Sequence, residues 1–284
     1  MRVLIVTAAN DPFVSVVSGL FKSLHRLRPQ LNFELACLDV GLNEVSRGLL
    51  SAYGVIFCIP GWDLPVRAET QLAQPHLRAL TARPFLRDYF PGFDAYVWID
   101  TDAWVQESFA LDYLIRAIRD GAFCAVAECA DAYKVGPEIL GWRRRRWVQA
   151  YGEEVLTRLP DPVYCNGGVF SLSDNSPFWG AWAHSFRQGL DHSEGLLCCD
   201  QSALNHALSQ TEIPRRILGA RFNWLCHLAM PHWNAARQRF TEPHRPDAIL
   251  GILHMSADTK RHDGSTQIAG APSSGLHFPR ELLT

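Results

Sequence analysis

Two aspartates stand directly after a short apolar run in the first half of the chain. The run VWI at 97–99 is followed by Asp100 and Asp102, with Thr101 between them. A buried strand that ends in two carboxylates offers a pair of hard oxygen ligands, which suit Mg²⁺ or Mn²⁺. Such a cation keeps its other positions for water and substrate phosphate. The structural alternative is that one aspartate caps a following helix.

The elements before this pair alternate between strand and helix patterns. Apolar runs predict strands at Val3–Val6, Phe33–Leu38, Val55–Ile59 and Ala95–Ile99, and helical spacing predicts helices at 13–27, 43–53, 75–80 and 84–89. This order is typical of a parallel sheet with crossover helices. Ligands of such sheets bind beyond the carboxyl ends of the strands. The loop 7–11 and the two aspartates both follow strand ends, so we expect them at one crevice.

After residue 105 the alternation becomes less regular. We expect strands at 123–127, 169–172, 215–218 and 249–254, and helices at 108–118, 142–156, 176–189 and 201–209. The chain has no evident internal repeat or linker. We therefore predict one α/β domain over 1–284, with a nucleotide-binding half at 1–105 and an acceptor-side half with a closing segment at 106–284.

The composition excludes several classes of protein. The 284 residues include 27 basic and 29 acidic ones, with a net charge of −2, so we expect no nucleic-acid partner. The opening MRVLIVTAAND is too short for a membrane span and lacks the features of a signal peptide. The 8 cysteines lie mostly in apolar runs without a C-x-x-C. Reduced thiols in a cytoplasmic protein fit this pattern better than disulfides or a zinc site.

Several blocks of the sequence together resemble glycosyltransferase family 8, the retaining GT-A enzymes that use nucleotide-sugar donors. The blocks are VTAANDPF at 6–13, LDVGLNE at 38–44, TARPFLRDYFPGFDAYVWIDTD at 81–102, NGGVFSL at 166–172, CDQSALN at 199–205, RFNW at 221–224 and ILHMSADTK at 252–260. Each block alone is weak, but their order follows the family over most of the chain. The resemblance implies a GT-A fold, a Rossmann-like mixed and mostly parallel sheet flanked by helices.

The resemblance implies that Asp100, Asp102 and His254 bind Mn²⁺. Two carboxylates and one imidazole are softer than an all-oxygen set, which favours Mn²⁺ and leaves Mg²⁺ as the alternative. The ion would bridge the donor diphosphate, and Lys260 would add a second cation on the leaving group. Taken alone, His254 also fits a core histidine and Lys260 a solvated lysine. Ala257 stands where the family has Gly, and the family's Pro-Trp after the lysine is missing, so the shape of the closing loop is open.

The resemblance also implies a donor site. Its expected residues are Ala8, Ala9, Asn10, Phe13, Arg83, Asp100, Thr101, Asp102, Asn166, Gly167, Gly168, Asp200, Gln201 and Lys260. Small residues in the first loop let the backbone approach the base, and the ring of Phe13 could stack on uracil or lie in the core. Asn10 replaces a frequently acidic residue, for which Asp11 could compensate.

Other members of this set suit the sugar and its phosphates. Arg83 suits bidentate contacts with phosphate or hydroxyls, and surface exposure is its alternative. The NGG segment is expected as a tight turn that admits a sugar. Asp200 and Gln201 carry the expected catalytic roles, with Asp200 on sugar hydroxyls and Gln201 near the anomeric carbon. Asp200 alone also fits a helix N-cap.

The segment GWRRRRWVQAYGEE at 141–154 lies on the expected acceptor side. Four consecutive arginines, 143–146, spread around all faces of a helix. One interpretation is a solvated helix whose Trp142 and Trp147 reach the core. The other is a site for an anionic acceptor, or for peripheral contact with the inner face of an anionic membrane. Three further tryptophans could stack on sugars or lie in the core: Trp62, Trp224 and Trp233.

Together these patterns predict a Mn²⁺-dependent retaining hexosyltransferase. The enzyme would move glucose or galactose from a UDP-sugar to a glycan or glycolipid acceptor, as in polysaccharide biosynthesis. Retention requires either a covalent intermediate, for which Asp200 is the candidate, or same-face attack, which the family's geometry favours. The alternatives are a nucleotidyltransferase, whose glycine- and arginine-rich loop is absent from 7–13, and a non-catalytic nucleotide- or sugar-binding module.

Overall fold

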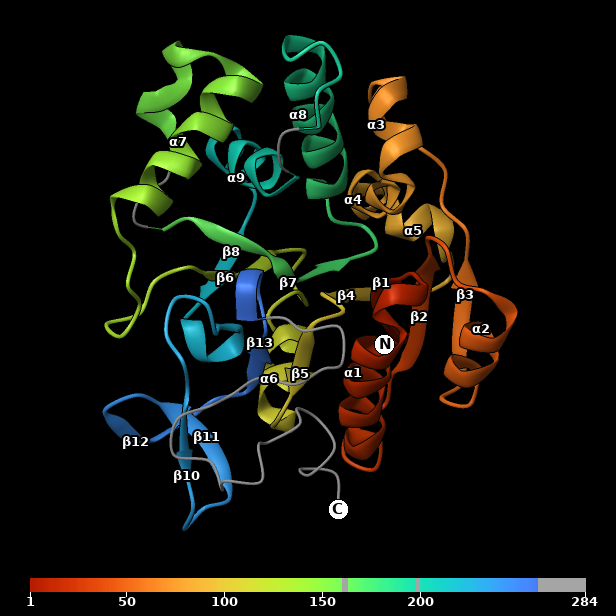
Figure 1. Cartoon of the computed structure of the whole chain (residues 1–284), viewed down its shortest axis with the longest axis vertical. Coiled ribbons are helices and arrows are strands. Elements are labelled where there is room, and N and C mark those ends of the chain that lie inside the picture. Colours follow the sequence, from red (N-terminus) through yellow and green to blue (C-terminus); the bar gives the residue numbers. More distant parts are fainter. Residues whose placement is uncertain (160–162, 198–199, 260–284) are drawn as a thin grey trace.

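The computed structural model describes residues 1–159, 163–197 and 200–259. Within these residues, a seven-stranded sheet with the order β3-β2-β1-β4-β7-β6-β8 forms the centre of the molecule (Figure 1). The strands are β1 (Val3–Ala9), β2 (Glu34–Asp39), β3 (Val55–Cys58), β4 (Ala95–Ile99), β6 (Phe123–Ala127), β7 (Cys165–Ser173) and β8 (Arg215–Leu218). All neighbours are parallel except β7, which runs antiparallel to β4 and β6. The predicted mixed, mostly parallel sheet is confirmed.

Helices cover both faces of this sheet. They are α1 (Val14–Leu27), α2 (Glu44–Ser51), α3 (Ala68–Ala73), α4 (Arg78–Ala82), α5 (Leu86–Tyr89), α6 (Ser108–Arg116), α7 (Pro137–Tyr151), α8 (Phe178–His192) and α9 (Asp200–Gln210). Short 3-10 helices lie at Asp11–Phe13, Pro75–Leu77, Arg83–Phe85, Glu153–Arg158, Ala220–Phe222 and Ala257–Thr259. In the described part of the chain, none of these helices has the length and apolar character needed to cross a membrane.

The alternation of side chains along the central strands divides the core into two layers. Ile5 on β1 packs in one apolar cluster with Leu20 of α1 and other residues of α1 and α6. Leu4, its neighbour, faces the opposite side and packs in a second cluster with Trp182 of α8 and with residues of α4, α5 and α9. Because both faces are apolar, the central strands appear in the sequence as continuous apolar runs.

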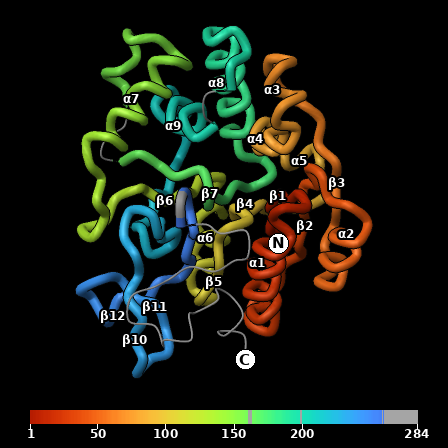
Figure 2. Tube along the Cα trace, viewed as in Figure 1, coloured from red at the N-terminus to blue at the C-terminus, as the bar shows by residue number. Residues whose placement is uncertain are grey.

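Two small sheets extend the second half of the chain. One contains β5 (Ala103–Val105), β13 (Ile252–His254) and β9 (Trp224–Leu225), and the other contains β10 (His232–Asn234), β11 (Arg239–Glu242) and β12 (Arg245–Ile249). Figure 2 shows β10, β11 and β12 at one end of the molecule, and α3, α7 and α8 at the other. None of β5, β9, β10 or β11 was predicted as a strand. The predicted strand 249–254 is two strands, β12 and β13, separated by residues 250–251.

Two further predictions need correction. The helix expected at 142–156 is α7, which begins at Pro137 and ends at Tyr151. Proline suits the first helical position, and Gly152 takes a φ of 85°, which ends the helix. The NGG segment is not a turn before the strand but part of β7 itself. A register shift opposite Ala125 and Val126 distorts the strand there.

Candidate active site

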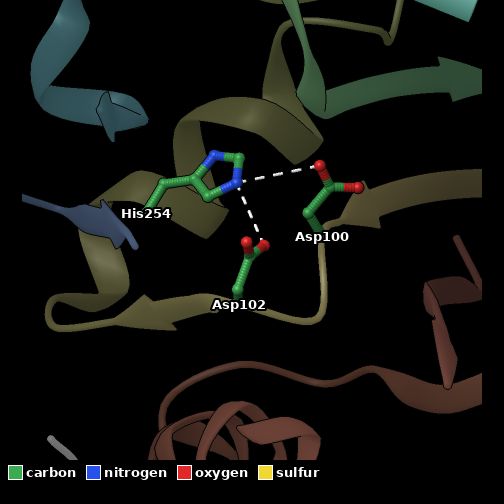
Figure 3. Close-up of side chains that lie close together, drawn as sticks. All are labelled: Asp100, Asp102 and His254. Carbon is green, nitrogen blue, oxygen red and sulfur yellow. Dashed lines mark ion pairs between the residues drawn. The ribbon is translucent and has the colours of Figure 1, made fainter. Parts of the chain in front are cut away.

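Asp100 and Asp102 occupy the tight turn between β4 and β5. The amide of Asp100 donates to the carbonyl of Gly168 at 2.8 Å, which keeps this residue tied to β7. The amide of Ala103 then donates to the carbonyl of Asp100 at 3.0 Å and closes the turn. The turn brings both carboxylates toward one side chain from the distant end of the chain, His254 (Figure 3).

His254 is the last residue of β13, and strand pairing places it at the two aspartates. It lies opposite Ala103 in the antiparallel pair of β13 and β5. Its Nε2 atom lies 3.1 Å from Oδ1 of Asp102 and 3.8 Å from Oδ2 of Asp100 (Figure 3). One ligand atom from each of the three residues lies within 4.8 Å of the others. The structure thus brings together the three residues implied by the family resemblance, whose role as metal ligands stays a prediction.

The hydrogen bonds around His254 define how its ring is oriented. Oδ1 of Asn166 accepts from the amide of Gly168 at 2.8 Å and from Nδ2 of Asn223 at 2.9 Å. Oδ1 of Asn223 therefore faces Nδ1 of His254, 3.0 Å away, and this nitrogen must carry the proton. Nε2 is left facing the carboxylates, so a cation, either a metal ion or a proton, belongs between them. The oxygen and nitrogen donors and the fixed ring fit Mn²⁺.

Arg83 connects the two acidic parts of the site. Its guanidinium is buried, donates through Nη2 to Oδ1 of Asp100 at 2.6 Å, and forms a close ion pair with Asp200 through Nη1. It also lies over the ring of Trp98, with Cζ 4.5 Å from the ring centre. Arg83 is therefore not an ordinary surface charge. Burial raises the pKa of the Asp200 carboxyl, and the charge of Arg83 opposes this rise.

Gln201 and Asn166 meet at a carboxylate that the sequence analysis missed. Oε1 of Glu128 accepts from Nε2 of Gln201 at 3.0 Å and from Nδ2 of Asn166 at 2.8 Å. Oε1 of Gln201 accepts from the amide of Gly167 at 3.0 Å. Glu128 follows the buried strand FCAVA directly, so it carries the same signal, a carboxylate after a core strand, that singled out Asp100.

A pocket of about 260 Å³ lies beside the aspartates. Its lining contains the predicted residues Ala8, Ala9, Asn10, Phe13, Arg83, Asp100, Thr101 and Asp102, together with Val40, His76, Leu77, Ala79, Leu80 and Trp98. Thr101 donates its hydroxyl to the carbonyl of Ala8 at 2.7 Å and so joins the two strand-end loops. Phe13 both lines the pocket and packs on an apolar cluster, so its two interpretations are compatible. Asp11 instead accepts from the backbone and side chain of Asn43.

Some predicted residues lie elsewhere or outside the described part. Lys260 lies outside the described residues. Trp224 is fully buried and donates its indole N–H to the carbonyl of Ala229, so it belongs to the core and is not available to a sugar. Trp147 is buried, but Trp142 is 38% exposed, so the interpretation in which both tryptophans reach the core fails for Trp142.

The arginine run does not form a uniformly solvated face. Arg144 and Arg145 are exposed as expected, and Arg146 is half-buried. Arg143 is 2% exposed and forms an ion pair with Glu128. The interpretation of a solvated run is therefore wrong for Arg143, because this position of α7 faces the interior of the molecule.

Comparison with solved structures identifies the class of fold. The galactosyltransferase LgtC, solved with donor and acceptor sugar analogues, superposes with a TM-score of 0.57 at 19% identity, over 90% of this chain and 88% of LgtC. Mouse xyloside xylosyltransferase 1 superposes with a TM-score of 0.55 at 15% sequence identity, over 92% of this chain and 99% of the xylosyltransferase. The glycosyltransferase GlyE of Streptococcus pneumoniae TIGR4 superposes with a TM-score of 0.53 at 18% sequence identity, over 92% of this chain and 56% of GlyE. The chain therefore has the GT-A fold of glycosyltransferases. Its sequence matches no family model and no curated protein.

Proposed function

We propose that this chain is a metal-dependent retaining glycosyltransferase. It moves a hexose, glucose or galactose, from a UDP-sugar to a glycan or lipid-linked acceptor. The proposal rests on the convergence of Asp100, Asp102 and His254 beside a pocket at the carboxyl edge of the sheet. Ligands of open α/β sheets bind at this edge. The shared fold of solved glycosyltransferases is consistent with the proposal.

The pocket residues give the donor its proposed place. Ala8 and Ala9 leave room for a base and ribose against the backbone, and the ring of Phe13 forms one wall. Asp100, Asp102 and His254 would hold Mn²⁺, which would supply positive charge for the leaving diphosphate. Lys260 is proposed to assist on the same leaving group.

The carboxylates near the donor support same-face attack over a covalent intermediate. Asp200 is buried and pairs one carboxylate oxygen with Arg83, whose positive charge makes the carboxylate a weaker nucleophile. Both oxygens of Glu128 accept hydrogen bonds from neighbouring side chains. In the proposed reaction Gln201 lies near the anomeric carbon, Asp200 orients sugar hydroxyls, and the departing phosphate accepts the proton of the acceptor hydroxyl.

Thermal unfolding with nucleotides tests this function. We expect UDP and one UDP-sugar to raise the melting temperature with Mn²⁺ and not with EDTA, because a ligand of the folded state stabilises it. Asp102→Asn and His254→Ala should remove the Mn²⁺-dependent part of the shift and the hydrolysis of the UDP-sugar. Asp247→Asn, on an exposed strand position, is the matched control. If no nucleotide shifts the transition, the cluster serves another ligand and the likeness is of fold alone.

A further inference from the structure

Arg143 is buried within a run of arginines that is otherwise at least partly exposed. Its side chain is 2% exposed, and Nη2 donates to Oε2 of Glu128 at 2.6 Å. The guanidinium also lies over the ring of Tyr164, with Cζ 4.8 Å from the ring centre. The side chain of Glu128 is 9% exposed, so α7 brings a buried cation to a largely buried anion.

The other oxygen of Glu128 determines the orientation of two amides. A carboxylate can only accept hydrogen bonds, so Gln201 and Asn166 must both turn their NH₂ groups toward Oε1 of Glu128. The carbonyl oxygen of Gln201 is thereby turned to the amide of Gly167 and to Nδ2 of Asn166, at 3.0 and 3.1 Å. Glu128 thus fixes which way the side-chain amide of Gln201 is turned, with its NH₂ group toward Glu128 and its carbonyl oxygen toward Gly167.

The same orientation continues to the metal site. Asn166 presents Oδ1 to Nδ2 of Asn223, and Asn223 presents Oδ1 to Nδ1 of His254. A directed series of hydrogen bonds therefore runs from Arg143 on α7 to the ring of His254. The carboxylate of Glu128, together with the backbone amides of Gly167 and Gly168, defines which side of each amide donates and which accepts.

A buried ion pair is a costly way to gain stability. Taking both charges out of water offsets most of their attraction, and apolar residues of similar volume are often as stable. An ion pair that also aligns side chains of the candidate catalytic site can instead contribute to the rate of the reaction. Misplacing a group by about 1 Å can cost about 100-fold in rate.

We propose that Arg143 is a positioning residue for glycosyl transfer, acting through Glu128 on the amide of Gln201. This inference rests on the proposed function for its kinetic consequence. Arg143 holds the carboxylate of Glu128 in place, and Glu128 holds Gln201 with its NH₂ group away from Gly167. Neither Arg143 nor Glu128 needs to touch the donor in this role.

The test compares Arg143→Met, Arg143→Lys and Glu128→Gln with Arg144→Met, which removes the neighbouring exposed arginine from the same helix. Hydrolysis of the UDP-sugar with Mn²⁺ is measured for each variant. We expect Arg143→Met and Glu128→Gln to lower kcat by about 10- to 100-fold, as for other groups that orient ligands of a site. The KM for the UDP-sugar should stay within about twofold, because the diphosphate contacts are untouched. Arg143→Lys should recover part of kcat, and Arg144→Met should match the wild type.

A second readout separates this inference from the proposed function. The side-chain NH₂ signals of Gln201 and Asn166 are followed by ¹⁵N NMR in the protein without ligands. They should shift or broaden in Arg143→Met and stay in place in Arg144→Met. A wild-type protein inactive on UDP-sugars would overturn the proposed function, and unmoved NH₂ signals would overturn the positioning by Arg143. An unchanged kcat in a folded Arg143→Met would also overturn it. So would a loss of affinity for the UDP-sugar as large, in fold-change, as the loss in kcat. If Arg143→Met does not fold, Arg143→Lys and Glu128→Gln decide by the same criteria.

Discussion

Oδ1 of Asn223 lies 3.0 Å from Nδ1 of His254 and accepts a hydrogen bond from this nitrogen. Asn223 is buried between the 3-10 helix Ala220–Phe222 and β9, so the contact is shielded from water. A partner on the far nitrogen holds an imidazole in the tautomer and orientation that a metal requires. Asn223 therefore supports the metal site without belonging to the three candidate ligands.

Asn223→Ala should weaken Mn²⁺ binding by about 10- to 100-fold, because the ring of His254 loses its fixed tautomer. Binding is measured by electron paramagnetic resonance of free Mn²⁺ in the presence of UDP. Asn175→Ala, at an exposed position, is the control and should bind as the wild type does. Equal Mn²⁺ affinity in Asn223→Ala and the wild type would show that His254 needs no such partner.

Gly168→Ala should abolish Mn²⁺ binding, whereas Gly167→Ala should leave it within about threefold. A Cβ at Gly168 would lie 2.4 Å from Cε1 of His254 and 2.8 Å from Oδ2 of Asp100. A Cβ at Gly167 would meet nothing closer than 3.4 Å, at Nη1 of Arg83. The same titration with Mn²⁺, in the absence of a sugar donor, compares the two variants. If both bind Mn²⁺ alike, the close packing around Gly168 is not required by the metal site.

The parts of this molecule that the sequence could predict depend on local patterns. The apolar run of β4 and the carboxylates after it are neighbours in sequence, so the position of Asp100 at a strand end followed from the residues alone. The parallel pairing of β1, β2 and β3 was also predictable, because a helix follows each of the first two strands in the sequence. The convergence of His254 was implied only by the family resemblance.

The missed features depend on contacts between distant segments. Strand β5 has three residues, too few for a periodic pattern, and it is a strand because β13 pairs with it. Arg143 stands in a strongly polar run, and nothing nearby in sequence indicates that it is buried. Its partner Glu128 lies before α7, and only the packing of α7 on the sheet brings the charges together.

Arg83→Met should lower the free energy of unfolding by about 3–5 kcal/mol, since it leaves two carboxylates, Asp100 and Asp200, without their shared cation. The pKa of Asp200, already raised by burial, should rise further. Urea unfolding of Arg83→Met, Asp200→Asn and the double variant measures the coupling. The double variant should be more stable than Arg83→Met alone. Strict additivity of the two changes would mean that the ion pair contributes nothing to folding.

His206 should make the protein less stable in mild acid. Its ring is buried, is stacked on Tyr151 at 3.8 Å between ring centres, and lies 2.7 Å from the hydroxyl of Ser185. Burial lowers the pKa of His206 from 6.5 to about 4. Between these values the unfolded chain binds more protons than the folded one, so stability is lost as the pH falls from 6.5 toward 4 and is retained above 6.5.

The expected loss from His206 is about 2 kcal/mol between about pH 7 and about pH 5, from the difference between the two pKa values. Urea unfolding at both pH values measures it. His206→Gln should unfold with a smaller dependence on pH, whatever its absolute stability, because the titrating ring is gone. His244→Gln, at an exposed position, should keep the wild-type dependence. An unchanged dependence in His206→Gln would assign the acid sensitivity to other groups.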